Sequence, residues 1–140
     1  MDRQCTVDYI DHVGVAVRDL ESSMAQLRDV FGIQPGEVKD LADQGVKATL
    51  LTLGQTRLEL LQPLSVDTTV GRFIERRGEG LHHVAFNVKN VGEALSAVKA
   101  KGLTVIDSAP RKGLSGLIAF IGLDGNIATT DQTGGRATQL

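Results

Sequence analysis

Apolar residues recur along the chain with two periods, that of a β-strand and that of an α-helix, and the same succession of periods occurs twice. Around His12 and again around His83 every second residue is apolar, which is typical of a β-strand with one buried face. A polar residue, Asp19 or Asn90, then precedes an apolar stripe at helical spacing, which predicts a capped helix. Runs typical of further strands occupy Lys47–Leu53, Thr56–Gln62, Leu103–Asp107, Leu117–Ile121 and Asn126–Asp131.

The two halves are related by an internal repeat. A shift of 71 residues lays Asp11–Leu27 over His82–Val98 and places His12 on His83. Two βαβββ modules are therefore expected at about residues 9–63 and 81–132, although the third strand of the first module is not separately resolved by the pattern. A linking helix over about 67–77, capped by Asp67, and a flexible tail over 133–140 complete the expected chain.

These elements predict an α+β fold rather than a wound βαβ sheet. The two βαβββ modules in tandem are expected to form a single domain, with a curled, cupped mixed sheet around a cavity for a metal and a substrate.

Composition removes several classes of function. The chain has 140 residues, 41% of them hydrophobic, and a formal net charge of -2, which gives no electrostatic case for nucleic acid or an anionic membrane. No run approaches the roughly 20 apolar residues of a membrane span. The single cysteine, Cys5, excludes an internal disulfide and fits a reducing compartment, so a cytoplasmic protein is expected.

Strand parity separates the adjacent histidines His82 and His83. Neighbouring residues on a strand point to opposite faces, and the repeat makes His83 the mate of His12. Small or polar residues accompany His12 and His83 at alternate positions, which suits a cavity wall, while valines occupy the other face. His83 is therefore predicted to face the cavity and His82 the opposite side or the strand end.

Glu59 is the third candidate for this site. A carboxylate between leucines is costly to bury unless it is paired or binds a metal. Taken alone, each of the three residues has an ordinary structural explanation. Together, two imidazoles and a carboxylate suit a divalent metal with open positions. A shift by the repeat length places Thr129 or Thr130, neither of them a good ligand, at the position equivalent to Glu59.

The segments "IDHVGVAV", "LGQTRLELLQPLSVDTTVGRFIERRGEGLHHVAFNV" and "FIGLDGN" resemble the vicinal oxygen chelate (glyoxalase/bleomycin resistance/dioxygenase) superfamily, and methylmalonyl-CoA epimerases most closely. The resemblance runs from about Tyr9 to Gln132. It implies a homodimer and a divalent ion (Co, Zn, Mn, Ni or Fe) held by His12, Glu59 and His83. Its fourth ligand, a glutamate in the last strand, is replaced here by Thr129.

The resemblance also implies an activity. Epimerases of this family stabilise an enolate of an α-carboxyacyl thioester such as methylmalonyl-CoA and move the α-proton with two acidic side chains. By motif, Asp43 matches one of these bases, with a shorter side chain, whereas the second base is the glutamate that Thr129 replaces. Water, Asp131 or another side chain would then return the proton.

Two other interpretations stay open. The same ligands with a vacant fourth position suit a different metal-dependent enzyme, such as an isomerase, a lyase or an Fe(II) dioxygenase. The lost ligand also fits a non-catalytic member that binds a small molecule. For an acyl-CoA substrate, the resemblance places the loop "PRKGLSG" at the substrate mouth, which makes candidates of Arg111, Lys112, Gly113 and Ser115.

Overall fold

The computed structural model describes residues 6–114, 116–121 and 127–131. The chain divides into two compact units, His12–His82 (the first unit) and His83–Leu140 together with Met1–Asp11 (the second unit). Strand β1 (Val7–Ala16) begins in the second unit and ends in the first. Within the described part of the chain there are eight strands, three α-helices and one 3-10 helix. None of the described helices is long and apolar enough to cross a membrane.

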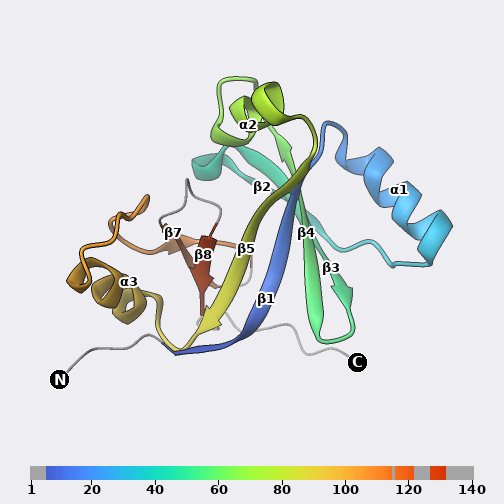
Figure 1. The fold of residues 1–140 in the computed structure, drawn as a ribbon. Helices are drawn as coiled ribbons and strands as arrows, with labels where there is room; N and C mark the ends of the chain where they lie inside the picture. The colour runs from blue at the N-terminus through green and yellow to red at the C-terminus, as the bar shows by residue number, and fades with distance from the viewer. Residues whose placement is uncertain (1–5, 115, 122–126, 132–140) are drawn as a thin grey trace. The chain divides into compact units, whose positions relative to one another are not determined.

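The first unit contains the first βαβββ module and the helix that follows it. After β1 its elements are α1 (Leu20–Phe31), β2 (Val38–Leu41), the 3-10 helix Ala42–Gln44, β3 (Val46–Leu53), β4 (Thr56–Pro63) and α2 (Thr69–Arg77). The strand order is β2-β3-β4-β1, with β1 and β4 parallel and the other pairs antiparallel. Figure 1 shows β3, β4 and β1 side by side, as this order requires.

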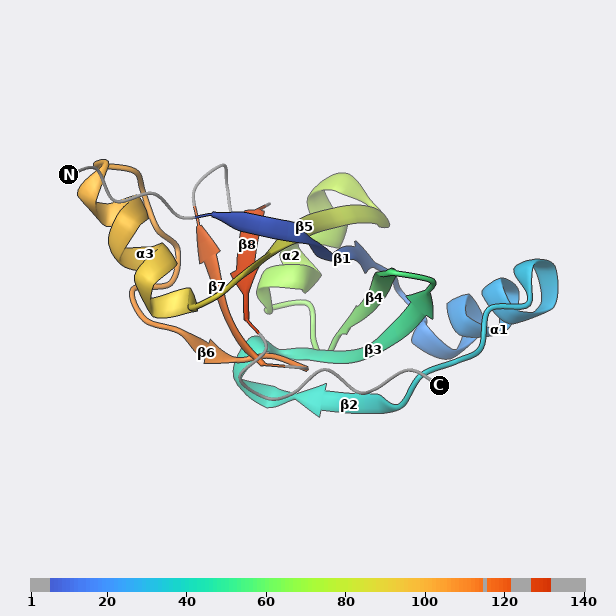
Figure 2. The same cartoon turned by 90° about the horizontal axis from the view of Figure 1, so that it is seen from below.

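The second unit repeats this plan. Its elements are β5 (Gly80–Val88, whose first three residues belong to the first unit), α3 (Val91–Ala100), β6 (Arg111–Lys112), β7 (Leu117–Ile121) and β8 (Ile127–Thr130). The order is β5-β8-β7-β6, again with one parallel pair, β5 with β8. Figure 2 shows β7 and β8 side by side. The predicted α+β class and the tandem βαβββ order are confirmed.

One predicted strand was wrong, and one strand that the pattern left unresolved is defined by the structure. Leu103–Asp107 forms no strand, because Val105 makes only an isolated bridge to Ile121, and β6 supplies the third strand instead. In the first module, β2 is the strand that the pattern left unresolved; most of its side chains are exposed, so it carries no apolar alternation.

Two of the three predicted helix N-caps are observed, and the third lies one residue further along the chain. Asp19 and Asn90 accept hydrogen bonds from the backbone N–H groups of Ser22 and Glu93, so both predicted N-caps are confirmed. Helix α2 is capped by Thr68 rather than by Asp67, because the Thr68 hydroxyl accepts the Gly71 N–H at 2.9 Å.

The strands of each module have one face that packs against the helix of that module and an opposite face that carries His12 or His83. The helix face of the first module is an apolar cluster of Val17, Leu20, Leu51 and Leu60, and that of the second is Val88, Val91, Ala94, Leu95 and Ala119. Since these strand residues alternate with His12 and His83, the histidines lie on the opposite face of their strands. We call that side the histidine face of each unit.

A strand-end side chain caps the helix in both modules. The N–H of Leu20, the first residue of α1, donates to Gln62 Oε1 at 2.8 Å, and the N–H of Val91, the first residue of α3, donates to Asp131 Oδ2 at 3.0 Å. Leu20 and Val91 are repeat mates, so Gln62 and Asp131 are structural equivalents. Both satisfy a helix N–H that has no partner within its helix.

Replacement of Asp131 by alanine is expected to lower the free energy of unfolding by about 1–3 kcal/mol, because it leaves the buried N–H of Val91 without this acceptor. Asp131→Asn keeps an acceptor oxygen and should lose clearly less. Urea unfolding followed by circular dichroism measures both, with Asp29→Ala on the exposed surface of α1 as the control. Equal losses in the two Asp131 variants would contradict the cap.

Candidate functional site

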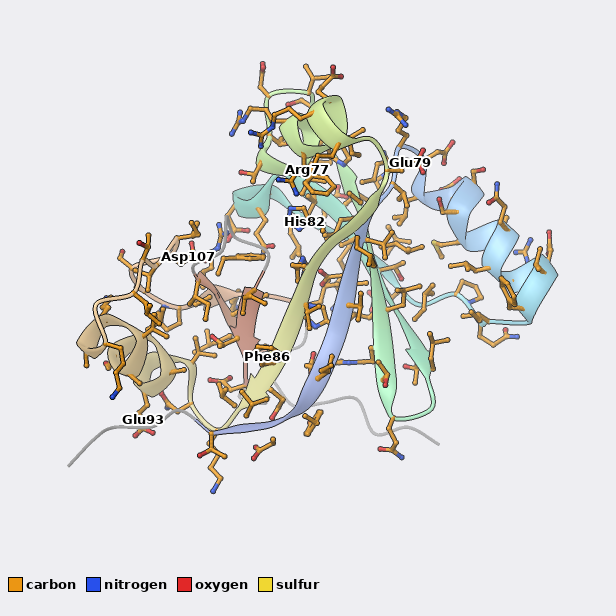
Figure 3. All side chains as sticks on the ribbon, in the orientation of Figure 1. Arg77, Glu79, His82, Phe86, Glu93 and Asp107 are labelled. Carbon is orange, nitrogen blue, oxygen red and sulfur yellow. The ribbon has the colours of Figure 1, made fainter. Side chains whose placement is uncertain are left out.

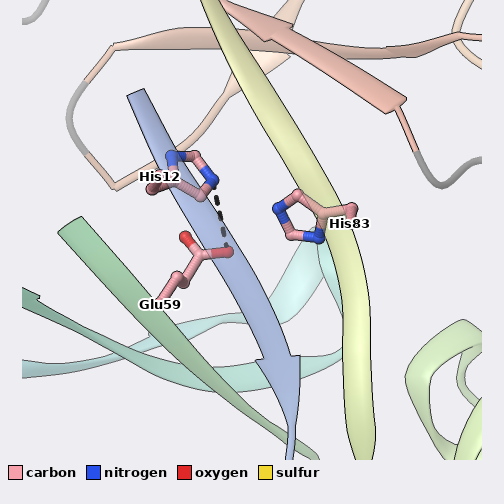
Figure 4. A group of neighbouring side chains, drawn as sticks. All are labelled: His12, Glu59 and His83. Atoms are coloured by element: carbon pink, nitrogen blue, oxygen red, sulfur yellow. Dashed lines mark ion pairs between the residues drawn. The ribbon is translucent and has the colours of Figure 1, made fainter. Parts of the chain in front are cut away.

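His12 and Glu59 form a buried pair in the first unit. In the parallel register of β1 with β4, Gly14 lies beside Glu59, and His12 is two residues before Gly14 on the same face. His12 Nε2 and Glu59 Oε1 are 3.7 Å apart, with side chains only 5% and 8% exposed (Figure 4). This distance exceeds that of a hydrogen bond, so the two polar atoms are close without being bonded directly.

The pair fits a shared metal ion. Ligand atoms about 2.1 Å from one ion at a tetrahedral angle lie about 3.4 Å apart, close to the observed 3.7 Å. An imidazole nitrogen and a carboxylate oxygen are also common donors to zinc and related divalent ions.

His83 lies on the histidine face of the second unit. Its side chain is buried, and its ring packs edge-on against Phe120 of β7, with centroids 5.2 Å apart. The guanidinium of Arg111 lies over the same Phe120 ring at 5.6 Å and forms an ion pair with Asp107 at 3.4 Å. An imidazole, an aromatic ring and a cation therefore occupy one face of this unit.

His82 has a different environment, in the first unit. Its ring packs edge-on against Phe73 of α2 at 4.9 Å. Arg77, which is labelled with His82 in Figure 3, lies over the same Phe73 ring. Burial lowers the pKa of His82 below its ordinary value, which favours the neutral ring. The expected supporting role of His82 at the strand end agrees with this contact to α2.

Thr129 does not lie where the motif placed it. In the β5–β8 register Thr129 is beside Phe86, and in the β8–β7 register it is beside Ala119, which belongs to the apolar cluster under α3. Residues beside each other in a sheet share a face, so Thr129 is on the helix face. The β8 residues on the histidine face are Ala128, beside Ala85 and Phe120, and Thr130.

The repeated helix cap supports the same correction. Glu59 stands three residues before Gln62 in β4, and Ala128 stands three residues before its equivalent, Asp131. Ala128 is therefore the structural mate of Glu59. At the strand position equivalent to Glu59, the second module therefore has the methyl group of Ala128.

The two acidic candidates for proton transfer lie elsewhere. Asp43 is exposed on the 3-10 helix Ala42–Gln44, a turn that packs beside the end of β4, where the N–H of Leu64 donates to Gly45 O. Leu64 is five residues after Glu59. The catalytic role of Asp43 stays a prediction. Asp131 is buried and caps α3, on the helix face, so it is not a base on the histidine face.

The candidate substrate loop is described in part. Arg111 is half-buried on the histidine face, since it pairs with Ile118, which lies beside Thr130. Lys112 points to the other side and is exposed. The Gly113 N–H donates to Gly116 O at 2.7 Å. Ser115 lies outside the described residues.

The structure also points to a residue that the sequence reasoning missed. Arg57 lies beside His12 in the β1–β4 register, two residues before Glu59 on the same strand face, and is only 5% exposed. The alternation in "TRLEL" carries this information, because Arg57 and Glu59 are separated by the period of a strand.

A family model supports the class that this fold and these side chains indicate. The model of the glyoxalase/bleomycin resistance protein/dioxygenase superfamily matches residues 11–120. The chain belongs to this superfamily.

Several relatives narrow the comparison. The chain is 35% identical over 109 residues to an ethylmalonyl-CoA/methylmalonyl-CoA epimerase of Cereibacter sphaeroides, covering 76% of this chain and 81% of the relative. It is 34% identical over 113 residues to the uncharacterized protein YqjC of Bacillus subtilis, covering 80% and 81%. A mouse mitochondrial methylmalonyl-CoA epimerase is 36% identical over 108 residues, 76% of this chain, which spans 61% of that relative's length.

Solved structures agree with these relatives. A methylmalonyl-CoA epimerase in complex with methylmalonyl-CoA and NH4⁺ matches 91% of this chain and 96% of its own, with a TM-score of 0.86 and 27% identity. A Streptomyces coelicolor methylmalonyl-CoA epimerase variant in complex with 2-nitronate-propionyl-CoA matches 91% and 99%, also with a TM-score of 0.86 and 27% identity. The relatives of this chain thus include epimerases of acyl-CoA thioesters.

Proposed function

We propose that the protein is a metal-dependent enzyme of epimerase type that acts on an α-carboxyacyl thioester such as methylmalonyl-CoA. The observation that carries this proposal is the buried pair of His12 and Glu59, whose polar atoms are 3.7 Å apart on the histidine face of the first unit. Its similarity to methylmalonyl-CoA epimerases of known structure supports the choice of substrate class.

In this proposal His12, Glu59 and His83 hold one divalent ion. Each offers one ligand atom, an imidazole nitrogen or a carboxylate oxygen, and all three residues are buried. When bound, the metal would supply Lewis acidity toward two neighbouring oxygen atoms of the substrate. With Ala128 at the strand position equivalent to Glu59, three protein side chains would hold the ion.

Proton transfer rests on one side chain. Asp43 acts as the general base that removes the α-proton, as its position in the motif implies. Neither Thr129 nor Ala128 can serve as a second base at neutral pH, and Asp131 caps α3. A single base returns the proton to the face from which it was taken, so exchange with solvent should be faster than inversion of configuration.

The acyl-CoA is the proposed small-molecule partner. We propose that Arg111, whose guanidinium lies over the Phe120 ring on the histidine face, meets an anionic group of this ligand. Its ion pair with Asp107 fixes the guanidinium in a half-buried position, which reduces the entropy lost when a phosphate or carboxylate binds.

Metal analysis combined with α-proton exchange tests the proposal. Purified protein is loaded separately with Co²⁺, Zn²⁺ or Mn²⁺, and methylmalonyl-CoA is followed in D₂O by NMR for exchange and by a chiral assay for inversion. We expect one ion per chain, exchange well above that of the metal alone, and slower inversion. Asp43→Asn should lower exchange at least about 100-fold. No exchange above the metal background would refute the proposal.

A second candidate function follows from the position of Ala128. Two histidines and one carboxylate with no fourth protein ligand are the set that non-haem Fe(II) oxygenases use. Anaerobic loading with Fe(II), followed by oxygen uptake with candidate substrates, distinguishes this function. Oxygen consumption coupled to substrate loss would favour it, whereas α-proton exchange with redox-inert Zn²⁺ would favour the epimerase type.

A further inference from the structure

We infer that Asp107 is a positioning residue for the proposed metal ligand His83, on which it acts through Phe120; this inference rests on the proposed function and adds a residue behind its metal ligands. Asp107 (labelled in Figure 3) lies between α3 and β6, and its side chain is 15% exposed. Asp107, Phe120, Arg111 and His83 all belong to the second unit, so their contacts lie within one compact body.

Asp107 holds the backbone of Phe120 at two points. The Phe120 N–H donates to Asp107 Oδ2 at 2.8 Å, and the Asp107 N–H donates to Phe120 O at 3.0 Å. Strand β6 pairs with β7 at Leu117 and Ile118, so Phe120 lies past the end of that pairing. The Asp107 carboxylate therefore takes the place that a backbone carbonyl of a neighbouring strand would have.

The ring of Phe120 contacts two polar side chains of the histidine face. The His83 ring meets it edge-on, with centroids 5.2 Å apart and an angle of 83° between the planes, and the Arg111 guanidinium lies over it at 5.6 Å. Arg111 Nε is also 3.4 Å from Asp107 Oδ2, the oxygen that accepts the Phe120 N–H. One carboxylate oxygen thus fixes both the backbone of Phe120 and the cation on its ring.

The contact with Phe120 restrains the plane of the His83 imidazole. The outer torsion of a histidine side chain has broad minima, so neighbouring groups decide which way the ring nitrogens point. An edge-to-face contact favours nearly perpendicular rings, as observed for His83 and Phe120. Groups that orient a metal ligand typically contribute about 10-fold to 100-fold in metal affinity. A Phe120 ring fixed by Asp107 supplies this orientation through packing.

Metal affinity and Co²⁺ spectra of the full chain test this role. Zn²⁺ and Co²⁺ are titrated against a chelator without substrate. Asp107→Ala should lower the affinity about 10-fold and change the intensity of the visible Co²⁺ bands, which report ligand geometry. Phe120→Leu, which removes the aromatic ring, should have a similar effect. Asp107→Asn keeps an acceptor oxygen for the Phe120 N–H and should restore the affinity to within about threefold of wild type.

Asp131→Ala is the matched control. It removes another carboxylate that accepts a backbone N–H in the same unit, but on the helix face, so it should destabilise the protein and leave the metal affinity and the Co²⁺ spectrum unchanged. Melting temperatures are measured on every variant. If Asp107→Ala does not fold, Asp107→Ser replaces it. Equal metal affinities and Co²⁺ spectra in the folded Asp107 and Asp131 variants would overturn the inference.

A measurement without metal separates this inference from the proposed function. The carbon-bound ring protons of His83, assigned with His83→Ala, should shift in NMR spectra of Asp107→Ala but not of Asp131→Ala, because the nearby Phe120 ring would move. If wild type exchanges no α-proton while Asp107→Ala weakens metal binding, the proposed function fails and the positioning role stands. If wild type binds no metal, the His83 resonances decide: a shift in Asp107→Ala supports the positioning of the ring, and unchanged resonances refute it.

Discussion

Replacement of His83 by alanine is expected to abolish stoichiometric metal binding, whereas His82→Ala retains most of it. His83 is the repeat mate of His12, lies on the histidine face and is proposed as one of three ligands. His82 instead packs against Phe73 of α2. Loss of one ligand of three removes most of the affinity for a divalent ion, because the remaining donors no longer replace its hydration shell. Elemental analysis after loading and dialysis measures the ion per chain.

Both alanine variants lose an aromatic contact, which makes them matched controls for stability. His83→Ala loses the edge contact to Phe120, and His82→Ala loses that to Phe73. Each should lower the free energy of unfolding by about 1–3 kcal/mol. The metal content of the two should differ even though their melting temperatures fall together. A similar loss of metal in both would overturn the separation by strand parity.

The second large effect concerns the missing fourth ligand. Ala128→Glu should create a carboxylate ligand on the histidine face, and Thr129→Glu should not, because Thr129 lies on the helix face beside Ala119. Without metal, each variant buries an unpaired carboxylate and should lose about 2–4 kcal/mol of stability. In Ala128→Glu the carboxylate is introduced among Ala85, Ile118 and Phe120. Saturating Zn²⁺ should restore Ala128→Glu and leave Thr129→Glu destabilised.

Thermal unfolding with and without Zn²⁺ measures this difference, and zinc titration against a chelator measures the tighter binding expected of Ala128→Glu. Ala128→Gln, of the same size without the charge, is the control and should gain much less from the metal. If zinc rescues Thr129→Glu instead, the motif alignment is right and the strand register is wrong.

The sequence was informative wherever apolar alternation was strong. Helices α1 and α3, their caps and the faces of β1 and β5 follow directly from periodicity and from the repeat. Strand β8 could not be read in this way, because Ala128, Thr129 and Thr130 are all small and all buried, so neither face is marked. Its register became clear only from its pairing with β5 and β7.

Two other features of the structure could not be predicted from the sequence, for different reasons. Leu103–Asp107 has the composition of a strand, yet Val105 makes only one bridge while Arg111 and Lys112 pair with β7. Tertiary pairing overrides local propensity at such short edges. Arg57 was visible in the alternation, but a single arginine in a strand usually marks an exposed edge, and its burial appears only in the folded unit.

The strand-end caps have a consequence for how a duplicated protein can diverge. Gln62 and Asp131 anchor the first turns of α1 and α3 from the helix face, while Glu59 and Ala128 stand three residues earlier on the opposite face. The residue that caps the helix and the residue on the histidine face therefore belong to the same strand but to opposite faces. One module can lose its polar residue on the histidine face without losing its helix cap, so the second module folds with an alanine where the first has a carboxylate.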